Sequence, residues 1–272
     1  MSATSAWVSH FGLGSSPFSK EIDDADLWLP SSKHALVDQL SDALSEKASV
    51  LLTGEPGVGK TCVLRALRHR LPQAGFRLTY CHNATLGRRD FYRQLCLALG
   101  LAPSATAAAV FYAVSSHIEE LGRERVHPVF LLDESHLLHQ DTLDHLHILL
   151  NYEWDSRALL SVILVGLPEL EDRLAMRRNR SLYSRLHWRL HLDPLVPDDT
   201  GEYLRTRLEA AGASREIFVS DAVAMLHEAT VGAMRDLDRL ASAALREAAR
   251  KKKKLVERDV VARVIDRDSR ED

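Results

Sequence analysis

The segment Gly54–Thr61 constrains the fold of this chain more than any other feature. It reads GEPGVGKT and matches the pattern GxxxxGK[ST] of a phosphate-binding loop. An apolar run, Val50–Thr53, precedes it, and an amphipathic stretch with leucines at helical spacing, Lys60–Leu71, follows it. A phosphate loop needs this order of strand, turn and helix, because the loop amides and the helix N-terminus bind phosphate oxygens together. The sequence therefore predicts a phosphate-binding loop within an α/β fold.

The residues of this loop have separate predicted roles. The glycines let backbone N–H groups turn inward onto phosphate, and the Lys60 ammonium group neutralises β- and γ-phosphate charge. The Thr61 hydroxyl is suited to bind Mg²⁺. The predicted nucleotide-binding residues of this segment are Gly54, Glu55, Pro56, Gly57, Val58, Gly59, Lys60, Thr61 and Cys62.

Short apolar runs alternate with helical patterns from residue 48 onward. The predicted strands are Val50–Thr53, Phe76–Cys81, Val129–Leu132, Leu159–Val165 and His187–Leu192. The predicted helices between them are Lys60–Leu71, Arg89–Leu99, Ala107–Leu121 and Leu137–Leu150. Parallel neighbours need crossover connections, and both faces of such a sheet must be covered. We therefore predict a parallel sheet sandwiched between helices.

The pattern changes after Pro194 and Pro197. Four helical stretches follow with no apolar strand run between them: Asp199–Ala210, Ser220–Ala229, Met234–Arg250 and Glu257–Ile265. These stretches predict a small all-helical second domain. The predicted organisation is an N-terminal segment 1–47 leading into the nucleotide site, an α/β core 48–194 and a helical domain 195–272.

Two adjacent carboxylates follow the third predicted strand. Asp133 and Glu134 end the run Val129–Leu132, and an acidic residue at the end of another apolar strand is the expected second half of a phosphate-loop site. Asp133 is placed to orient Mg²⁺ through water, and Glu134 is suited to polarise an attacking water. A solvated strand end is the alternative for this pair. The upstream phosphate loop favours the catalytic interpretation.

Composition excludes several classes of protein. Lys plus Arg number 35 against 38 for Asp plus Glu, so no overall basic excess favours nucleic acid or acidic membranes. The longest apolar runs, such as Ala107–Val114, fall far short of the ~20 residues that cross a bilayer. Cys62, Cys81 and Cys96 form no CxxC pair, which fits packing residues in a reducing cytosol. We expect a cytoplasmic protein without a membrane partner.

The histidines do not predict a metal centre. His136, His139, His145 and His147 lie within twelve residues, but no cysteine is near them in sequence and no HExxH spacing occurs. Ordinary core and helix-surface histidines explain this group, and we predict no zinc.

With these motifs in place, the chain resembles the AAA+ ATPases over most of its length. The resemblance implies ATP and Mg²⁺ as cofactors, hydrolysis to ADP and phosphate, and an all-helical lid after the core. Residues 232–235, GAMR, resemble the sensor-2 motif, in which Arg235 reaches the nucleotide phosphates; a surface arginine is the alternative. Arg185 stands where the superfamily usually places its trans-acting arginine finger, with Arg180 and Arg189 as competitors.

Two positions match the family pattern less well. Leu167 stands where a polar sensor-1 residue is expected, and its side chain cannot hydrogen-bond water or phosphate. Either Ser161 or another group compensates, or hydrolysis is slow. Asn83 resembles the polar residue that in some relatives holds the catalytic Glu until a partner binds, and a turn-forming Asn is the alternative.

Further segments resemble one branch of this superfamily, the ExeA-type ATPases and the related transposition helpers of the TniB and MuB kind. They are Phe11-Gly12-Leu13 with Pro17-Phe18, DESHLL, VGLPEL and LDPLVPDDTGEYLRTRL. ExeA carries a membrane segment and a peptidoglycan-binding region after its ATPase, and we expect neither here. The resemblance thus implies an ATPase that assembles on duplex DNA without strong sequence preference and directs a DDE transposase to its target.

Local basic patches are candidates for the DNA contacts. Residues 173–191 contain six arginines and no acidic residue, and such a patch can contact phosphates without making the whole protein basic. A solvated or subunit-facing arginine cluster is the alternative, as is a solvated helix end for Lys251–Lys254. The candidate DNA-binding residues are Arg88, Arg89, Arg177, Arg178, Arg180, Lys251 and Lys252.

The leading hypothesis is an ATP-dependent regulator of DNA transposition that forms a homo-oligomeric ring or filament. Its catalytic residues would be Lys60, Glu134, Arg185 and Arg235. One alternative is an ExeA-type ATPase of secretion or envelope assembly, which would need a separate membrane partner. Another is a nucleotide-dependent scaffold with negligible turnover, which Leu167 at the sensor position favours.

Overall fold

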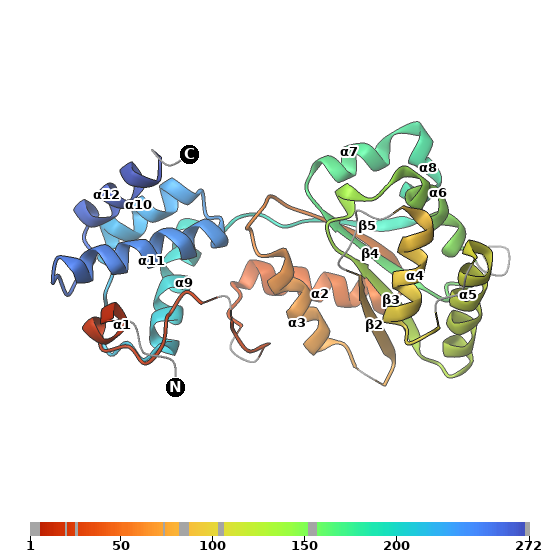
Figure 1. The fold of residues 1–272 in the computed structure, drawn as a ribbon, viewed down its shortest axis with the longest axis horizontal. Helices are drawn as coiled ribbons and strands as arrows, with labels where there is room; N and C mark the ends of the chain where they lie inside the picture. Colours follow the sequence, from red (N-terminus) through yellow and green to blue (C-terminus); the bar gives the residue numbers. More distant parts are fainter. Residues whose placement is uncertain are drawn as a thin grey trace. The chain divides into compact units, whose positions relative to one another are not determined.

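The computed structural model describes residues 6–19, 21–24, 27–72, 74–81, 87–102, 106–151 and 157–269. The chain divides into two compact units (Figure 1). The helical unit comprises Met1–Lys33, Pro56–Cys62 and Asp193–Asp272, and the sheet unit comprises His34–Glu55 and Val63–Leu192. Most of the phosphate loop therefore groups with the C-terminal helices. The domain limits at 48–194 and 195–272 stay predictions.

A five-stranded parallel sheet forms the centre of the sheet unit, in the order β2-β3-β4-β1-β5. The strands are β1 (Ser49–Thr53), β2 (Phe76–Cys81), β3 (His127–Leu132), β4 (Ser161–Gly166) and β5 (Leu186–His191). Every residue of β1, β3 and β4 is buried, whereas the edge strands β2 and β5 include exposed positions. Central parallel strands are covered on both faces, which is why they read as continuous apolar runs.

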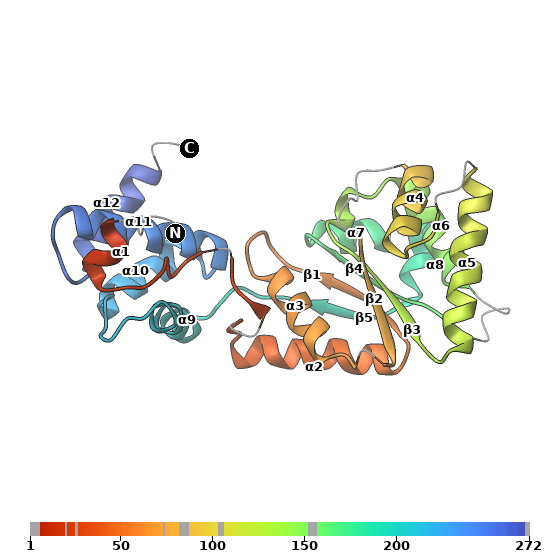
Figure 2. The ribbon, with the colours of Figure 1, turned by 60° about the horizontal axis from the view of Figure 1, so that its bottom comes forward.

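Helices cover both faces of this sheet (Figure 2). One face carries α2 (Ser31–Ser45) and α3 (Lys60–Arg70), and the other carries α4 (Arg88–Ala98), α5 (Ala107–Arg123) and α6 (Gln140–Leu149). Leu51, Phe130 and Leu164 from the strands share one buried cluster with Tyr92 of α4 and Ile118 of α5. The predicted sandwich of a parallel sheet between helical layers is confirmed.

Some elements differ from the sequence prediction. No helix was predicted within residues 1–47, where α2 lies. The helix predicted from Leu137 begins at Gln140, because a 3-10 turn, η2 (Ser135–Leu137), follows the left-handed backbone of Glu134. The short helices α7 (Glu169–Ala175) and α8 (Arg180–Tyr183), with the 3-10 turn η4 (Arg177–Asn179) between them, are too brief to produce a readable apolar stripe.

The helical unit contains the four helices expected after Pro194. They are α9 (Pro197–Ala210), α10 (Ser220–Thr230), α11 (Met234–Arg250) and α12 (Arg258–Asp268). The short helix α1 (Ala6–Phe11) adds to them from the other end of the chain. Val8, Phe11 and Phe18 are buried in the same apolar cluster as Leu237 and Leu245 of α11. The predicted all-helical region is confirmed, and the N-terminal segment belongs to its core.

The helices of the described ranges include none with both the length and the apolar run that crossing a lipid bilayer requires. Cys62, Cys81 and Cys96 form no disulfide bond with one another, and the last two are buried in the core. Burial raises the pKa of the Cys81 thiol to about 12, so this group is a packing residue at physiological pH.

Candidate nucleotide-binding site

The candidate site begins at the carboxyl edge of the sheet. β3, β4 and β1 are neighbours, so the segments that leave their carboxyl ends start along one edge. The Gly54 N–H donates to the Gly166 carbonyl over 3.2 Å, which joins the start of the phosphate loop to the end of β4. Asp133 and Glu134 follow β3 directly. In open α/β sheets, ligands bind at this edge.

The phosphate loop packs against the N-terminus of α11 within the helical unit. Gly57 and Gly59 have φ values of +80° and +102°, which favour glycine. A Cβ at Gly57 would lie 3.0 Å from Arg235 Cβ, and one at Gly59 would lie 2.8 Å from Met234 Sδ. The Arg235 N–H donates to the Gly57 carbonyl over 3.2 Å. Both glycines thus serve the backbone conformation and the close approach of α11.

The glycine of the GAMR segment fixes how α11 begins. Gly232 has a φ of +75°, and its carbonyl accepts the Leu195 N–H over 3.0 Å. A Cβ at this position would lie 2.1 Å from the Leu195 carbonyl oxygen, so any larger residue would displace one of the two segments. The turn therefore sets the position of Arg235 beside the loop.

The carboxylate of Asp133 is held at both oxygens. Asp133 is 8% exposed; Oδ1 accepts the Glu134 N–H over 2.9 Å, and Oδ2 accepts the Tyr80 hydroxyl over 2.9 Å. Partial burial of the phenol, together with the Asp133 charge, raises the pKa of Tyr80, so the phenol remains a donor at neutral pH. A carboxylate has about four acceptor sites, so capacity for a metal-bound water remains.

Glu134 occupies a strained backbone position. Its φ of +53° and ψ of 35° place it in the left-handed region, which is uncommon for a residue with a side chain and concentrates at functional sites. The side chain is about half exposed, and Oε2 lies 3.6 Å from Nδ1 of His136. This nitrogen is buried and forms no hydrogen bond with the described residues. A base for an attacking water needs such an accessible carboxylate.

Sequence reasoning missed two polar residues beside this site. Tyr80 is the penultimate residue of β2 and pairs with Leu131 of β3, so its contact with Asp133 follows from strand order. Lys33 is buried on the apolar stripe of α2, at helical spacing from Leu36, Val37 and Leu40. The sequence signal for Lys33 was a lysine among the apolar residues of a helical stripe.

The arginines of residues 173–191 have different surroundings. Arg173 donates to the carbonyls of His136 and Leu138 over 2.9 and 2.7 Å, so it supports the turn after β3. Arg185, the predicted trans-acting finger, donates to the Ser181 carbonyl over 3.1 Å, just before β5. The guanidinium of its competitor Arg189 stacks 3.7 Å from the Tyr183 ring centroid.

Several candidate DNA-binding residues have intramolecular acceptors. The Arg88 guanidinium contacts His145 Nε2 at 2.7 Å, and Arg178 pairs with Asp144 at 2.8 Å. Lys251 pairs with the buried Glu247 at 3.3 Å. Arg89, Arg177, Arg180 and Lys252 are exposed. The Asp144 carboxylate therefore reduces the positive potential beside Arg178, and the Glu247 carboxylate reduces that beside Lys251.

The structure corrects one suggestion about the sensor-1 position. Ser161, a candidate replacement for the missing polar group, begins β4, at the end of the strand opposite to Gly166. Its hydroxyl contacts His127 Nε2 at 2.8 Å. Ser161 therefore cannot compensate for Leu167, which directly follows the strand. The other candidate in this region, Asn83, lies outside the described residues.

No group of three or more His, Cys, Asp or Glu side chains among the described residues is arranged to hold a metal ion. For Mg²⁺, the donors present are of a suitable kind: a hydroxyl at Thr61 and a pre-oriented carboxylate at Asp133.

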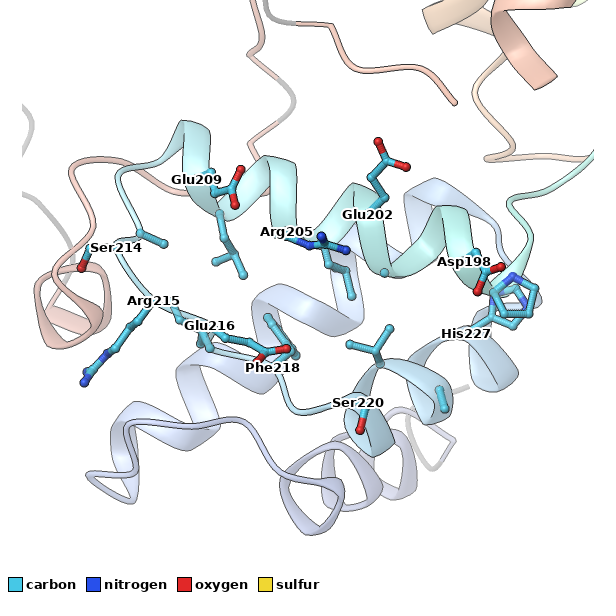
Figure 3. Close-up of a pocket in the computed structure, with 18 residues that line it drawn as sticks. Asp198, Glu202, Arg205, Glu209, Ser214, Arg215, Glu216, Phe218, Ser220 and His227 are labelled. Atoms are coloured by element: carbon cyan, nitrogen blue, oxygen red, sulfur yellow. The ribbon is translucent and has the colours of Figure 1, made fainter. Parts of the chain in front are cut away.

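A cleft of about 890 Å³ opens in the helical unit between α9 and α10 (Figure 3). Buried Leu204, Leu208 and Phe218 line it, and charged side chains surround it: Asp198, Glu202, Arg205, Glu209, Arg215 and Glu216. None of the predicted nucleotide-binding residues lines this cleft. We therefore build the nucleotide site on the phosphate loop and not on this cleft.

A parallel sheet with a glycine-rich phosphate loop after β1 and an acidic pair after β3 defines the α/β P-loop NTPase class. Residues 22–174, more than half of the chain, match the model of a family described as "AAA domain". The protein belongs to this AAA domain family, and the predicted AAA+ membership is confirmed.

One relative is similar to this chain over almost the whole length of the chain. General secretion pathway protein A of Aeromonas hydrophila is 33% identical over 258 residues, which are 93% of this chain and 47% of that protein. The chain thus spans about half the length of this relative. The similarity agrees with the ExeA-like part of the resemblance.

Solved structures share the fold at low identity. Drosophila ORC bound to DNA has a TM-score of 0.70 at 20% identity, covering 97% of this chain and 66% of that one. Cdc6p from Pyrobaculum aerophilum has a TM-score of 0.65 at 18% identity, covering 86% and 68%. The RuvB Holliday junction branch migration motor of Thermotoga maritima has a TM-score of 0.59 at 17% identity, covering 88% and 69%.

Proposed function

We propose that this protein binds ATP and hydrolyses it to ADP and phosphate. The observation that carries the proposal is a glycine-dependent phosphate loop after β1, combined with an acidic pair after β3 at the same sheet edge. The family supports this chemistry. Phosphoryl transfer depends mainly on positioning and charge stabilisation, which these residues supply.

Each side chain has a role in this proposal. Lys60 contacts the β- and γ-phosphates, and Glu134 orients and polarises the attacking water. Mg²⁺, when bound, neutralises phosphate charge, and Thr61 and Asp133 are the residues that would hold it. Arg235 senses the phosphates in cis, and Arg185 acts in trans on the nucleotide of a neighbouring copy.

Glu134→Gln tests the hydrolysis step. The amide keeps the shape of the side chain but cannot accept a proton, so ATP binding should persist while turnover falls at least about 100-fold. Lys60→Ala is the matched control that should lose ATP binding as well. Phosphate release and ATP affinity are measured for both variants. Unchanged turnover in Glu134→Gln would refute the assignment.

We further propose that the ATP-bound form assembles on duplex DNA and recruits a DDE transposase. The sequence resemblance to transposition helpers supports this role, as does the exposed arginine group Arg177, Arg178 and Arg180. Arginine contacts to phosphate would give binding that ignores base sequence and weakens steeply with salt. Drosophila ORC, whose fold is similar, was solved bound to DNA.

Two other roles have specific support. The 33% identity to General secretion pathway protein A favours a role in secretion, where a membrane partner would supply the anchoring segment. Leu167 after β4 favours a nucleotide-dependent scaffold with negligible turnover, because this side chain cannot orient the attacking water. Tight ATP binding with phosphate release at background would favour the scaffold.

Assembly on DNA separates the transposition and secretion roles. Wild-type protein with a non-hydrolysable ATP analogue and duplex DNA should form large particles in electron microscopy, and DNA should raise the ATPase rate. Replacing Arg177, Arg178 and Arg180 with Ala should abolish both effects, whereas the control Arg215→Ala should retain them. No assembly and a DNA-independent rate would refute the transposition role and favour secretion.

A further inference from the structure

Lys33 is a buried cation with an unusual environment. It lies in the first turn of α2 and is only 2% exposed, although lysine is rarely buried without a partner. Its Nζ donates to two backbone carbonyls, that of Val58 in the phosphate loop over 3.0 Å and that of Asp193 over 2.8 Å. Both contacts lie within the helical unit. The ammonium group thus joins the phosphate loop to the segment that leads into α9.

The contact with Val58 controls the direction of an amide. The Val58 carbonyl and the Gly59 N–H belong to one planar trans peptide unit, so they point in opposite directions. A donor that holds the carbonyl on one side therefore aims the N–H at the other side. The preceding peptide unit is held in the same way, because the Arg235 N–H binds the Gly57 carbonyl over 3.2 Å and so directs the Val58 N–H. Two successive loop amides are oriented by donors on their carbonyls.

A buried charge is a costly way to satisfy two backbone carbonyls. Burial of an ammonium group costs free energy, and this cost offsets much of what its two hydrogen bonds to backbone carbonyls contribute. Burial lowers the pKa of Lys33 to about 8, while the charges of Asp199, Cys62 and Asp193 oppose this change. A methionine could fill a similar volume without the desolvation cost. The contact of this cation with the Val58 carbonyl points to a role in the phosphate loop.

We propose that Lys33 is a positioning residue of the nucleotide site, which holds the Val58 carbonyl so that the Gly59 amide faces the bound phosphates. The inference rests on the proposed binding of ATP. It adds a residue outside the phosphate-loop pattern that pre-orients the loop before ATP arrives. Pre-orientation raises affinity because less ordering is left to occur on binding.

The test compares the full-length Lys33→Met protein with wild type by isothermal titration calorimetry with ATP and Mg²⁺ and by thermal unfolding without nucleotide. We expect the Lys33→Met protein to remain folded at 25 °C and to unfold at a somewhat lower temperature than wild type, because the Val58 and Asp193 carbonyls lose their donor. Its affinity for ATP should be at least about tenfold weaker, because a hydrogen bond from a charged donor has been lost. Lys33→Arg, which retains a cationic donor, should recover part of the affinity.

Two controls separate this result from structural damage and from failure of the underlying function. Leu40→Ala removes a fully buried side chain from the same helix and should lower the unfolding temperature while leaving ATP affinity within twofold. Lys60→Ala should abolish binding. If wild type binds ATP and Lys33→Met binds it within twofold, the proposal is overturned. A Lys33→Met protein that is unfolded at 25 °C before nucleotide is added would also overturn it. Failure of wild type to bind ATP would overturn both proposals.

Discussion

Replacing Tyr80 with Phe removes one hydroxyl that contacts the Asp133 carboxylate. The lost hydrogen bond is 2.9 Å long and runs from a neutral donor to a charged acceptor, a type worth about 1.5–3 kcal/mol. Tyr80 is 47% exposed, so water can replace part of this interaction. We expect the free energy that holds the Asp133 carboxylate in its orientation to fall by about 1 kcal/mol. Oδ1 keeps its bond from the Glu134 N–H. The fold of the sheet should be unaffected.

The expected effect is on Mg²⁺ dependence. Because Asp133 is proposed to hold Mg²⁺, a loss of about 1 kcal/mol corresponds to a roughly fivefold higher Mg²⁺ concentration at half-maximal ATPase rate. The assay is a Mg²⁺ titration of phosphate release at saturating ATP. Tyr112→Phe, at a position 74% exposed on α5, is the control and should match wild type. A Tyr80→Phe midpoint equal to or below that of wild type would refute the reasoning.

Two further predictions follow from backbone geometry and from burial. Gly59→Ala should weaken ATP binding at least tenfold, because φ at this position is +102° and the new Cβ would lie 2.8 Å from Met234 Sδ. The control is Gly100→Ala, at a φ of +74° with no atom within 4 Å of the new Cβ, and it should retain the affinity for ATP. Equal calorimetric affinities for the two variants would contradict this. Burial, with a smaller effect of the Lys47 charge, lowers the pKa of His127 from 6.5 to about 4. Between these two pH values the folded state binds fewer protons than the unfolded state, so the free energy of unfolding decreases as the pH falls from 6.5 to about 4. Urea unfolding at pH 7.5 and pH 4 should show wild type losing about 3 kcal/mol more than His127→Gln, and an equal loss would exclude this source.

The phosphate loop could be predicted from the sequence, whereas the order of the strands in the sheet could not. GEPGVGKT was readable because glycine and lysine spacing encodes the loop directly, and β1, β3 and β4 were readable because both of their faces are covered. The role of Tyr80 was not readable, since it depends on β2 lying beside β3. Lys33 contacts Val58 and Asp193, which are distant in sequence, and only tertiary packing brings them together.

Ser161 shows a different kind of failure. Its hydroxyl is a sequence candidate for the missing sensor-1 group, but a residue at the start of a parallel strand lies at the edge away from the site. Strand direction and length would have excluded it without a structure. The N-terminal segment could not be assigned from sequence because Val8, Phe11 and Phe18 gain their partners only in the folded helical unit.

The shared core of the two ends of the chain has a consequence for synthesis. Val8, Phe11 and Phe18 are synthesised long before the residues of α11 and α12 with which they share a buried cluster. The sheet unit can fold between these two events because its elements, from α2 to β5, lie between Phe18 and α9 along the chain. Val8, Phe11 and Phe18 therefore stay exposed to solvent until α11 has been synthesised. Contacts between residues so distant in sequence form slowly, and apolar side chains favour aggregation until they are buried.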